Sequence, residues 1–196
     1  MHALAEFQGM AVRDLRYYGS KEAVPALKAC TEDSPNCFST TGRPQLDADH
    51  LVAPWRPPVG YSADKAARDL EAVVRAYKPG QAGIDGGGFK VITSSASGAE
   101  SAPGALYYLY AQFESLRQGY IDDVEFSIVP SSNRSPGDSG ALEVLLRSSS
   151  RLGYLDFAVN AMRLNYIAAR LRDKGWTALA IDRKSHQDYF YQNSQH

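Results

Sequence analysis

The stretch Glu143–Arg172, EVLLRSSSRLGYLDFAVNAMRLNYIAARLR, decides the fold that this sequence predicts. It begins as a strand, because Arg147, Ser149 and Arg151 recur at every second residue and therefore share one face. Gly153 ends this alternation, and apolar residues at helical spacing follow it. The stretch therefore predicts an arginine-bearing strand that turns at a glycine into a helix.

Polar residues mark the start of this predicted helix. Asp156 stands where an N-cap is expected, because its carboxylate can accept the free N–H groups of the first turn. Asn160 and Arg163 follow at steps of four and three, so all three residues lie on one side of the helix. The apolar stripe consists of Val159, Ala161, Met162, Leu164, Ile167, Ala168 and Leu171.

Composition and charge limit the class of protein. The chain has 196 residues, of which 44% are hydrophobic and 22% charged, which is typical of a globular domain. Its formal net charge of −1 gives no electrostatic reason to expect nucleic acid as a partner. No apolar run approaches the roughly 20 residues that cross a bilayer. The first residues lack the apolar core of a signal peptide, so we expect a cytosolic chain or a mature form.

The two cysteines, Cys30 and Cys37, are seven positions apart. A disulfide between them would close a small loop and contribute about 2.5 kcal/mol on the chain-entropy model. Two free thiols are the alternative. A zinc site is disfavoured because His50 is the only further ligand nearby and a structural site needs four. The disulfide, if formed, places the protein in an oxidising compartment.

Three regions follow along the chain. Residues 1–28 form an N-terminal extension with a short amphipathic segment, 29–182 form a single domain, and 183–196 form a tail without a place in that domain. The domain begins with a proline-containing loop, and a helix capped by Ser62 follows. The glycine-rich run after this helix is a linker, because it lacks the lysine of a phosphate-binding loop.

Four strands are then expected, namely 89–93, 105–117, 122–130 and the one starting at Ala141. Short polar turns connect the last three, which favours an antiparallel meander. The predicted fold is therefore α+β, with a sheet of about four strands and two helices on one face in a two-layer sandwich.

Three blocks of the sequence resemble the DUF1499 family, a domain of unknown function. They are CTEDSPNC at 30–37, DDVEF at 122–126 and RSSSRLGYLDFAVNAMR at 147–163. The resemblance spans residues 29–174 and implies no established activity. It implies settings outside the cytosol, because bacterial members look exported or lipid-anchored and plant and algal members look targeted to the chloroplast.

The charged residues of these blocks form a candidate site with two interpretations. Asp123 and Glu125 share one strand face, and Arg147 and Arg151 are expected across from them. A buried ion-pair network that fixes strand register is one interpretation. A pocket for an anionic ligand, or a hydrolytic site, is the other. The complete candidate cluster is Asp122, Asp123, Glu125, Arg147, Ser149, Arg151, Asp156, Asn160 and Arg163.

A serine hydrolase is disfavoured on these residues. A nucleophile among Ser148, Ser149 and Ser150 would need a base, and His50 is the only histidine within the family-like region. We expect His50 instead to be a loop histidine that bonds to the backbone.

Aromatic residues in the tail indicate a partner. Tyr189, Phe190 and Tyr191 lie among polar residues near the end of the chain, and tyrosine and phenylalanine are frequent interface anchors. With no catalytic residue, metal or cofactor assigned, we expect a non-catalytic extrinsic or assembly subunit of a larger protein complex. A photosynthetic membrane complex in the chloroplast thylakoid lumen is the favoured setting, and the bacterial periplasm or another exported compartment is the alternative.

Overall fold

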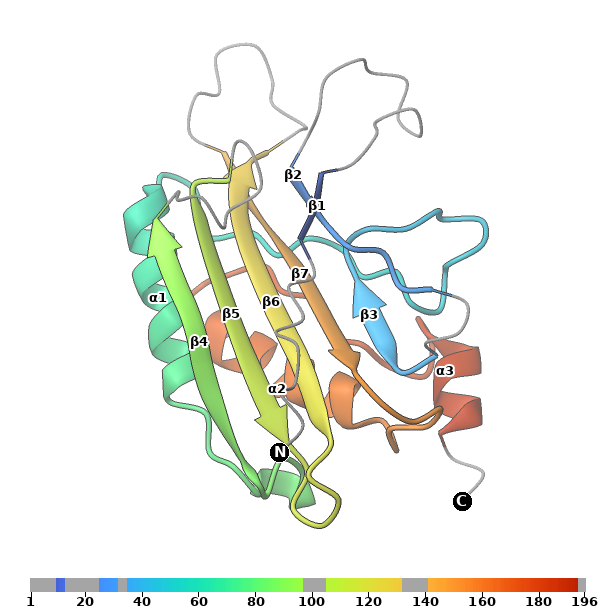
Figure 1. Cartoon of the computed structure of the whole chain (residues 1–196). Coiled ribbons are helices and arrows are strands. Elements are labelled where there is room, and N and C mark those ends of the chain that lie inside the picture. The colour runs from blue at the N-terminus through green and yellow to red at the C-terminus, as the bar shows by residue number, and fades with distance from the viewer. Residues whose placement is uncertain (1–9, 13–24, 32–34, 97–104, 132–140, 194–196) are drawn as a thin grey trace.

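The computed structural model describes residues 10–12, 25–31, 35–96, 105–131 and 141–193. Its centre is a five-stranded antiparallel sheet with the order β3-β7-β6-β5-β4 (Figure 1). The strands are β3 (Cys37–Ser39), β4 (Gly88–Ala96), β5 (Tyr107–Glu114), β6 (Ile121–Pro130) and β7 (Leu142–Ser150). Because β4 to β7 pair in sequence order, the predicted meander and the α+β class are confirmed.

Strand β3 is the strand of the main sheet that the sequence prediction missed. It lies in the segment predicted as a loop, yet it pairs along the edge of β7, with Cys37 opposite Ser149 and Ser39 opposite Arg147. Three residues are too few to show an alternating pattern in the sequence. The strand is recognised only from its pairing with β7 in the structure. The sheet therefore has five strands rather than about four.

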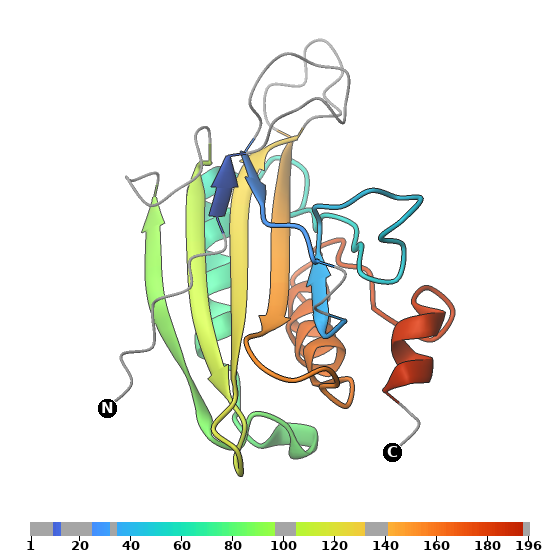
Figure 2. The ribbon, with the colours of Figure 1, turned by 45° about the vertical axis from the view of Figure 1, so that its right-hand side comes forward.

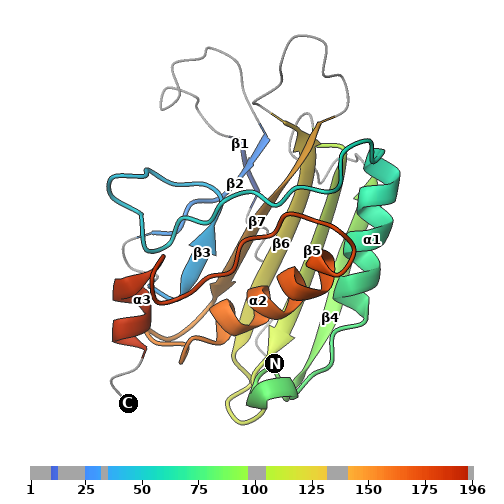
Figure 3. The ribbon, with the colours of Figure 1, turned by 180° about the vertical axis from the view of Figure 1, so that it is seen from behind.

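Both long helices cover one face of the sheet (Figure 3). They are α1 (Ala63–Arg75) and α2 (Val159–Arg172). The predicted cap of α1 is confirmed, because the Ser62 side chain accepts a hydrogen bond of 3.2 Å from the backbone N–H of Lys65. A short 3-10 helix, η2 (Gln81–Gly83), follows α1.

A small second sheet lies against the opposite face (Figure 2). It consists of β1 (Met10–Val12) and β2 (Pro25–Leu27), which pair antiparallel. These described parts of the N-terminal extension, which was predicted to be a short amphipathic segment and a loop, are strands. Leu27 is fully buried and packs against Tyr108 and Tyr110 of β5, so the extension contributes to the second face of the fold.

The main core lies between the sheet and the helices. Strand side chains at every second position enter it, among them Leu109, Phe126 and Leu146, and Leu164 of α2 meets them. All four are fully buried. The predicted two-layer packing is confirmed, and it holds α2 against the inner face of the sheet.

The C-terminal segment packs on the domain instead of standing apart from it. The short helix α3 (Gln187–Gln192) places Tyr189 in the main core, where its ring lies 4.5 Å from that of Phe38. Tyr189 is only 1% exposed. Its assignment to a partner interface was therefore wrong, and the segment belongs to the fold. Phe190 is half-buried, and Tyr191 remains exposed.

Candidate functional site

The structure divides the predicted charged cluster between the two faces of the sheet. Strand β6 alternates, so Asp123 and Glu125 point away from the helices whereas Asp122 points toward them. The sequence treated these residues as one cluster, because their spacing does not show that a sheet one layer thick separates them. We describe them as an outer ladder and an inner network.

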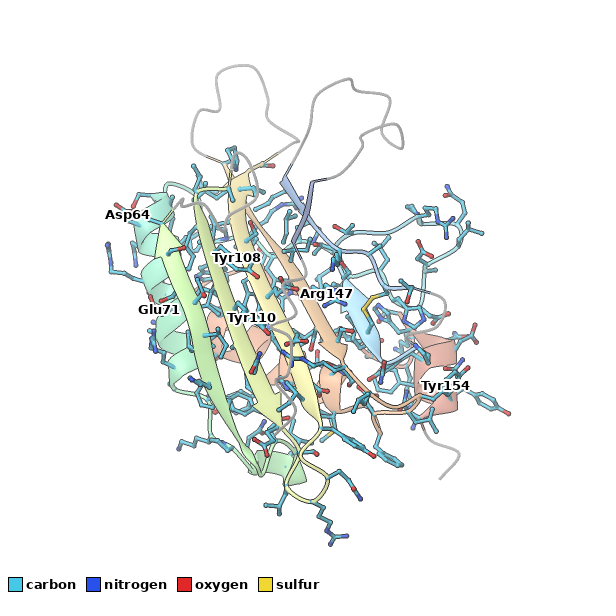
Figure 4. All side chains as sticks on the ribbon, viewed as in Figure 1. Asp64, Glu71, Tyr108, Tyr110, Arg147 and Tyr154 are labelled. Atoms are coloured by element: carbon cyan, nitrogen blue, oxygen red, sulfur yellow. A yellow bond between two sulfur atoms is a disulfide. The ribbon has the colours of Figure 1, made fainter. Side chains whose placement is uncertain are left out.

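Register across β6 and β7 forms the outer ladder. Glu125 lies opposite Arg147, as the sequence predicted, and a carboxylate oxygen of Glu125 lies 3.5 Å from Arg147 Nη1. Tyr108 of β5 donates a hydrogen bond of 2.6 Å to the same carboxylate. Figure 4 shows Tyr108, Tyr110 and Arg147 on this face. Glu125 and Arg147 are both buried, and a buried ion pair of this kind favours the register in which its partners face each other.

Asp123 and Arg151 continue the ladder as a two-pronged ion pair. Arg151 Nε and Nη2 donate to the two Asp123 carboxylate oxygens at 2.8 and 2.9 Å. Tyr110 donates to Asp123 at 2.6 Å, and burial together with this bond raises the pKa of Tyr110 to about 12. Ser149 lies opposite Asp123 in the register. This bidentate pairing engages the Nε and Nη2 edge of the Arg151 guanidinium with a carboxylate rather than with an external anion.

Arg163 is the centre of the inner network. It is fully buried on α2, and its Nε and Nη2 donate to Asp85 at 2.9 and 2.6 Å. Nη2 also donates to Asp122 at 2.6 Å, while Nη1 donates to Asn160 at 3.0 Å. Its guanidinium stacks over the ring of Phe113, 4.7 Å from the centroid. Burial opposes the charge, but the two carboxylates prevail and raise the pKa of Arg163.

For Asp122, burial affects the pKa more than the neighbouring guanidinium does. Burial raises the pKa of its carboxyl above the usual range, although Arg163 and a hydrogen bond from Ser150 work against that shift. Its side chain is 11% exposed, whereas that of Asp85 is 2% exposed. Asp122 is therefore the carboxylate of the Arg163 pair that reaches solvent.

Asp156 organises the turn before α2. It accepts hydrogen bonds from the backbone N–H of Asn160 at 2.9 Å and from the Asn160 side chain at 2.7 Å. Tyr189 donates to both of its oxygens, at 2.9 and 3.0 Å. The N-cap position belongs to Ala158, however, because the helix begins at Val159. Asp156 thus holds a first-turn N–H of the helix from two residues before the cap.

No serine in β7 is paired with the predicted base. Ser148 donates to Asn160, the Ser149 hydroxyl bonds to the Ser150 carbonyl, and Ser150 accepts from Asn160. His50 Nδ1 lies 2.9 Å from the Cys37 carbonyl oxygen, which confirms the predicted backbone contact. This geometry gives no support to a Ser–His hydrolase.

A pocket of about 470 Å³ opens beside the inner network, at the end of the sheet where β5 turns into β6. Asp85, Asp122 and Asp156 line it together with a largely apolar wall. Four of the ten large hydrophobic side chains exposed among the described residues border this pocket. These four, hereafter the apolar rim, are Leu116, Tyr120, Leu152 and Phe157.

Unusual backbone conformations surround the pocket. Phe157 and Ala158 are consecutive non-glycine residues with φ of 54° and 63°, and Asp85 has a φ of 54°. Each conformation costs free energy and persists only where the surrounding contacts impose it. Hydrogen bonds from Ala158 N–H to Asp156 and Asn193 supply such contacts. The turn that carries Phe157 is therefore held by Asp156 within the turn and by Asn193 at the end of the C-terminal helix.

Sequence reasoning missed several residues of this site. Asp85 was treated as part of a glycine-rich linker, and Tyr77, which donates to it at 2.5 Å, was not among the candidate residues. The rim residues gave no periodic signal because they come from two separate loops, one between β5 and β6 and one between β7 and α2. The one available indication of Asp85 in the sequence was an aspartate within a run of glycines. Glycine lets this loop pack closely on β5, because a Cβ on Gly87 would lie only 2.9 Å from the Glu114 carbonyl oxygen.

The remaining features concern stability and metals. Cys30 and Cys37 form a disulfide, with Cα atoms 5.7 Å apart, as predicted. Within the segments that the structure describes, no group of three or more His, Cys, Asp and Glu side chains is arranged to hold a metal ion. Among those same segments, no helix combines the length and apolar character that a bilayer crossing requires.

The fold and site define a class: a disulfide-bonded, two-layer α+β protein with a meander sheet and an arginine–carboxylate network under one helix. Residues 26–171 match the model of the family described as "Protein of unknown function (DUF1499)", and the chain belongs to that family. Neither the curated proteins nor the solved structures contain a match to this chain.

Proposed function

We propose that this protein is a non-catalytic binding subunit that attaches to a larger protein complex through the apolar rim. The observation that carries the proposal is the gathering of Leu116, Tyr120, Leu152 and Phe157 around one pocket. Contiguous exposed apolar surface on a folded protein marks an interaction site more often than scattered single residues do. Aromatic side chains in such a patch are common anchors.

The polar groups support binding rather than chemistry. A general base or nucleophile needs a group that is available to a substrate, with its proton acceptor poised nearby. Here Asp123 is held by Arg151 and Tyr110, and Asp85 is held by Arg163 and Tyr77. Such saturated networks position a fold, and they favour a scaffold role.

The disulfide supports a setting outside a reducing cytosol, because such bonds persist in oxidising compartments. Within that range we propose the thylakoid lumen and a photosynthetic membrane complex, following the plastid members of the family. The bacterial periplasm is the alternative setting.

The test is the native size of the protein in gently solubilised source membranes. Wild-type protein is expected to migrate with one large complex at fixed stoichiometry. Leu152→Glu places a charge on the rim and is expected to release the protein as a free species. Leu179→Glu is the matched control, because Leu179 is equally exposed, at 64%, and lies outside the pocket. A Leu152→Glu protein that remains in the complex would refute the proposed contact.

A small anionic ligand bound by Arg147 and Arg151 of the outer ladder is a second candidate. Arg163, which the sequence grouped with them, is fully buried on the other face of the sheet and cannot contact the same small ligand. The observation that favours this candidate is the residual 15% exposure of the Arg151 side chain. It predicts that Arg151→Ala abolishes anion binding while the protein stays folded. The ion pairs argue for the opposite result, in which Arg151→Ala lowers stability because Asp123 loses its buried partner.

A further inference from the structure

The pocket inside the apolar rim has an acidic floor. Asp85, Asp122 and Asp156 line it, and the buried cation behind them is Arg163. Arg117 also borders the pocket, but it is exposed on the rim. The three carboxylates outnumber the two guanidinium groups of Arg163 and Arg117. The pocket is therefore electrostatically suited to a positive group.

We propose that this pocket receives the charged end of a lysine or arginine side chain that the partner protein inserts between apolar residues of its own. The proposal rests on the proposed function and specifies the chemistry of the partner. The apolar walls suit the methylene stem of such a side chain, whose charged end then reaches the polar floor. The pocket volume of about 470 Å³ falls within the range of roughly 300–1,000 Å³ that ligand sites occupy.

Asp122 is the carboxylate that would meet the incoming cation. Asp156 accepts from two backbone N–H groups, the Asn160 side chain and Tyr189, and Asp85 accepts from Arg163 and Tyr77. A carboxylate has about four acceptor positions. Asp156 fills them, and Asp85 accepts three hydrogen bonds while its side chain is only 2% exposed.

Asp122, in contrast, accepts from Arg163 and Ser150, and it retains surface within the pocket. It therefore has acceptor capacity to spare. A cation there would also offset the burial of a carboxylate that Arg163 already shares with Asp85.

Peptide probes test the proposal on the purified full-length protein without knowledge of the partner. The probes are acetyl-Leu-Lys-Leu-amide, acetyl-Leu-Arg-Leu-amide and the neutral acetyl-Leu-Gln-Leu-amide, and backbone amide NMR shifts report their binding. The basic peptides are expected to shift the amides of Ser150, Leu152 and Val159 and to bind about tenfold more tightly than the neutral one. Equal binding of all three, or no shift at these amides up to millimolar peptide, would overturn it.

A charge variant adds a second arm. Asp122→Asn is expected to remove the preference for the basic peptides, and Asp64→Asn, an exposed aspartate on α1, is expected to leave it intact. Preference that survives Asp122→Asn would overturn the role of Asp122. If Asp122→Asn does not fold, the comparison of peptides on wild-type protein still decides. A negative result with the peptides would refute the cation pocket but not the proposed function, because Leu152→Glu tests the apolar contact separately.

Discussion

Arg163 Nη2 lies 2.6 Å from Asp85 Oδ1 and 2.6 Å from Asp122 Oδ2, so one guanidinium joins three parts of the chain. Asp85 comes from the glycine-rich loop after α1, Asp122 from the start of β6, and Arg163 from α2. These contacts fix α2 against the sheet at the level of the pocket. The pocket floor is therefore a direct product of the network that orients the helix.

Replacing Arg163 by methionine should destabilise the protein strongly. Methionine preserves much of the volume but leaves two buried carboxylates without their cation, a type of change that costs about 3–5 kcal/mol. Chemical denaturation of the variant measures the loss. Arg170→Met is the control, since the Arg170–Asp173 pair is exposed and surface pairs contribute about 0–1 kcal/mol. Similar losses in both variants would contradict the importance of the network.

Tyr189→Phe should lower the free energy of unfolding by about 1–3 kcal/mol, because the Asp156 carboxylate loses a buried hydroxyl donor. The ring itself stays in the core, so the variant isolates the hydrogen bond. Tyr154→Phe removes the hydroxyl of an exposed tyrosine in the same turn and should change stability little (Figure 4). Thermal unfolding compares the two. Equal melting temperatures for Tyr189→Phe and wild type would show that α3 is not held through Asp156.

Loss of the Cys30–Cys37 disulfide should cost about 2.5 kcal/mol, the loop-closure contribution of a short loop. For a chain of this size that loss corresponds to a drop of roughly 5–10 °C in melting temperature. Calorimetry of the Cys30→Ser/Cys37→Ser variant measures it. Reductant should lower the melting temperature of the wild type and leave the variant unchanged. A wild type that is insensitive to reductant would contradict the prediction.

Acidification should weaken the docking of the C-terminal segment through His186. Burial lowers the pKa of His186 below its ordinary value of 6.5, against the opposing effects of the Leu51 carbonyl and of Asp49 and Asp182. The unfolded chain therefore binds the proton first as the pH falls. The stability that neutral His186 contributes is present above pH 6.5 and is lost below it.

The variant His186→Gln tests this sign. Its unfolding free energy should fall less than that of the wild type between neutral pH and pH 5, because glutamine does not titrate. The difference between the two curves isolates His186 from the carboxyls that titrate in the same experiment. Parallel curves would exclude a contribution from this residue.

Much of the outer ladder followed from the sequence. Asp123, Glu125, Arg147 and Arg151 alternate on adjacent strands, and a meander places such residues across from one another. The inner network did not follow, because Asp85 lies 78 positions from Arg163. No local spacing relates two residues that are so far apart. The same limit hid Tyr189, whose partner Asp156 lies 33 positions away.

The sequence by itself determined the elements with strong local signals. The periods of two and 3.6 and the Ser62 cap determined the four meander strands, the two long helices and the α+β class, and the cysteine spacing favoured the disulfide. Only the tertiary structure decided which face each charge occupies, that Tyr189 belongs to the core, and that the rim surrounds an acidic pocket. The reason is physical: local patterns record which way a side chain points along its own element. Burial and charge pairing, however, depend on elements that meet only when the layers pack.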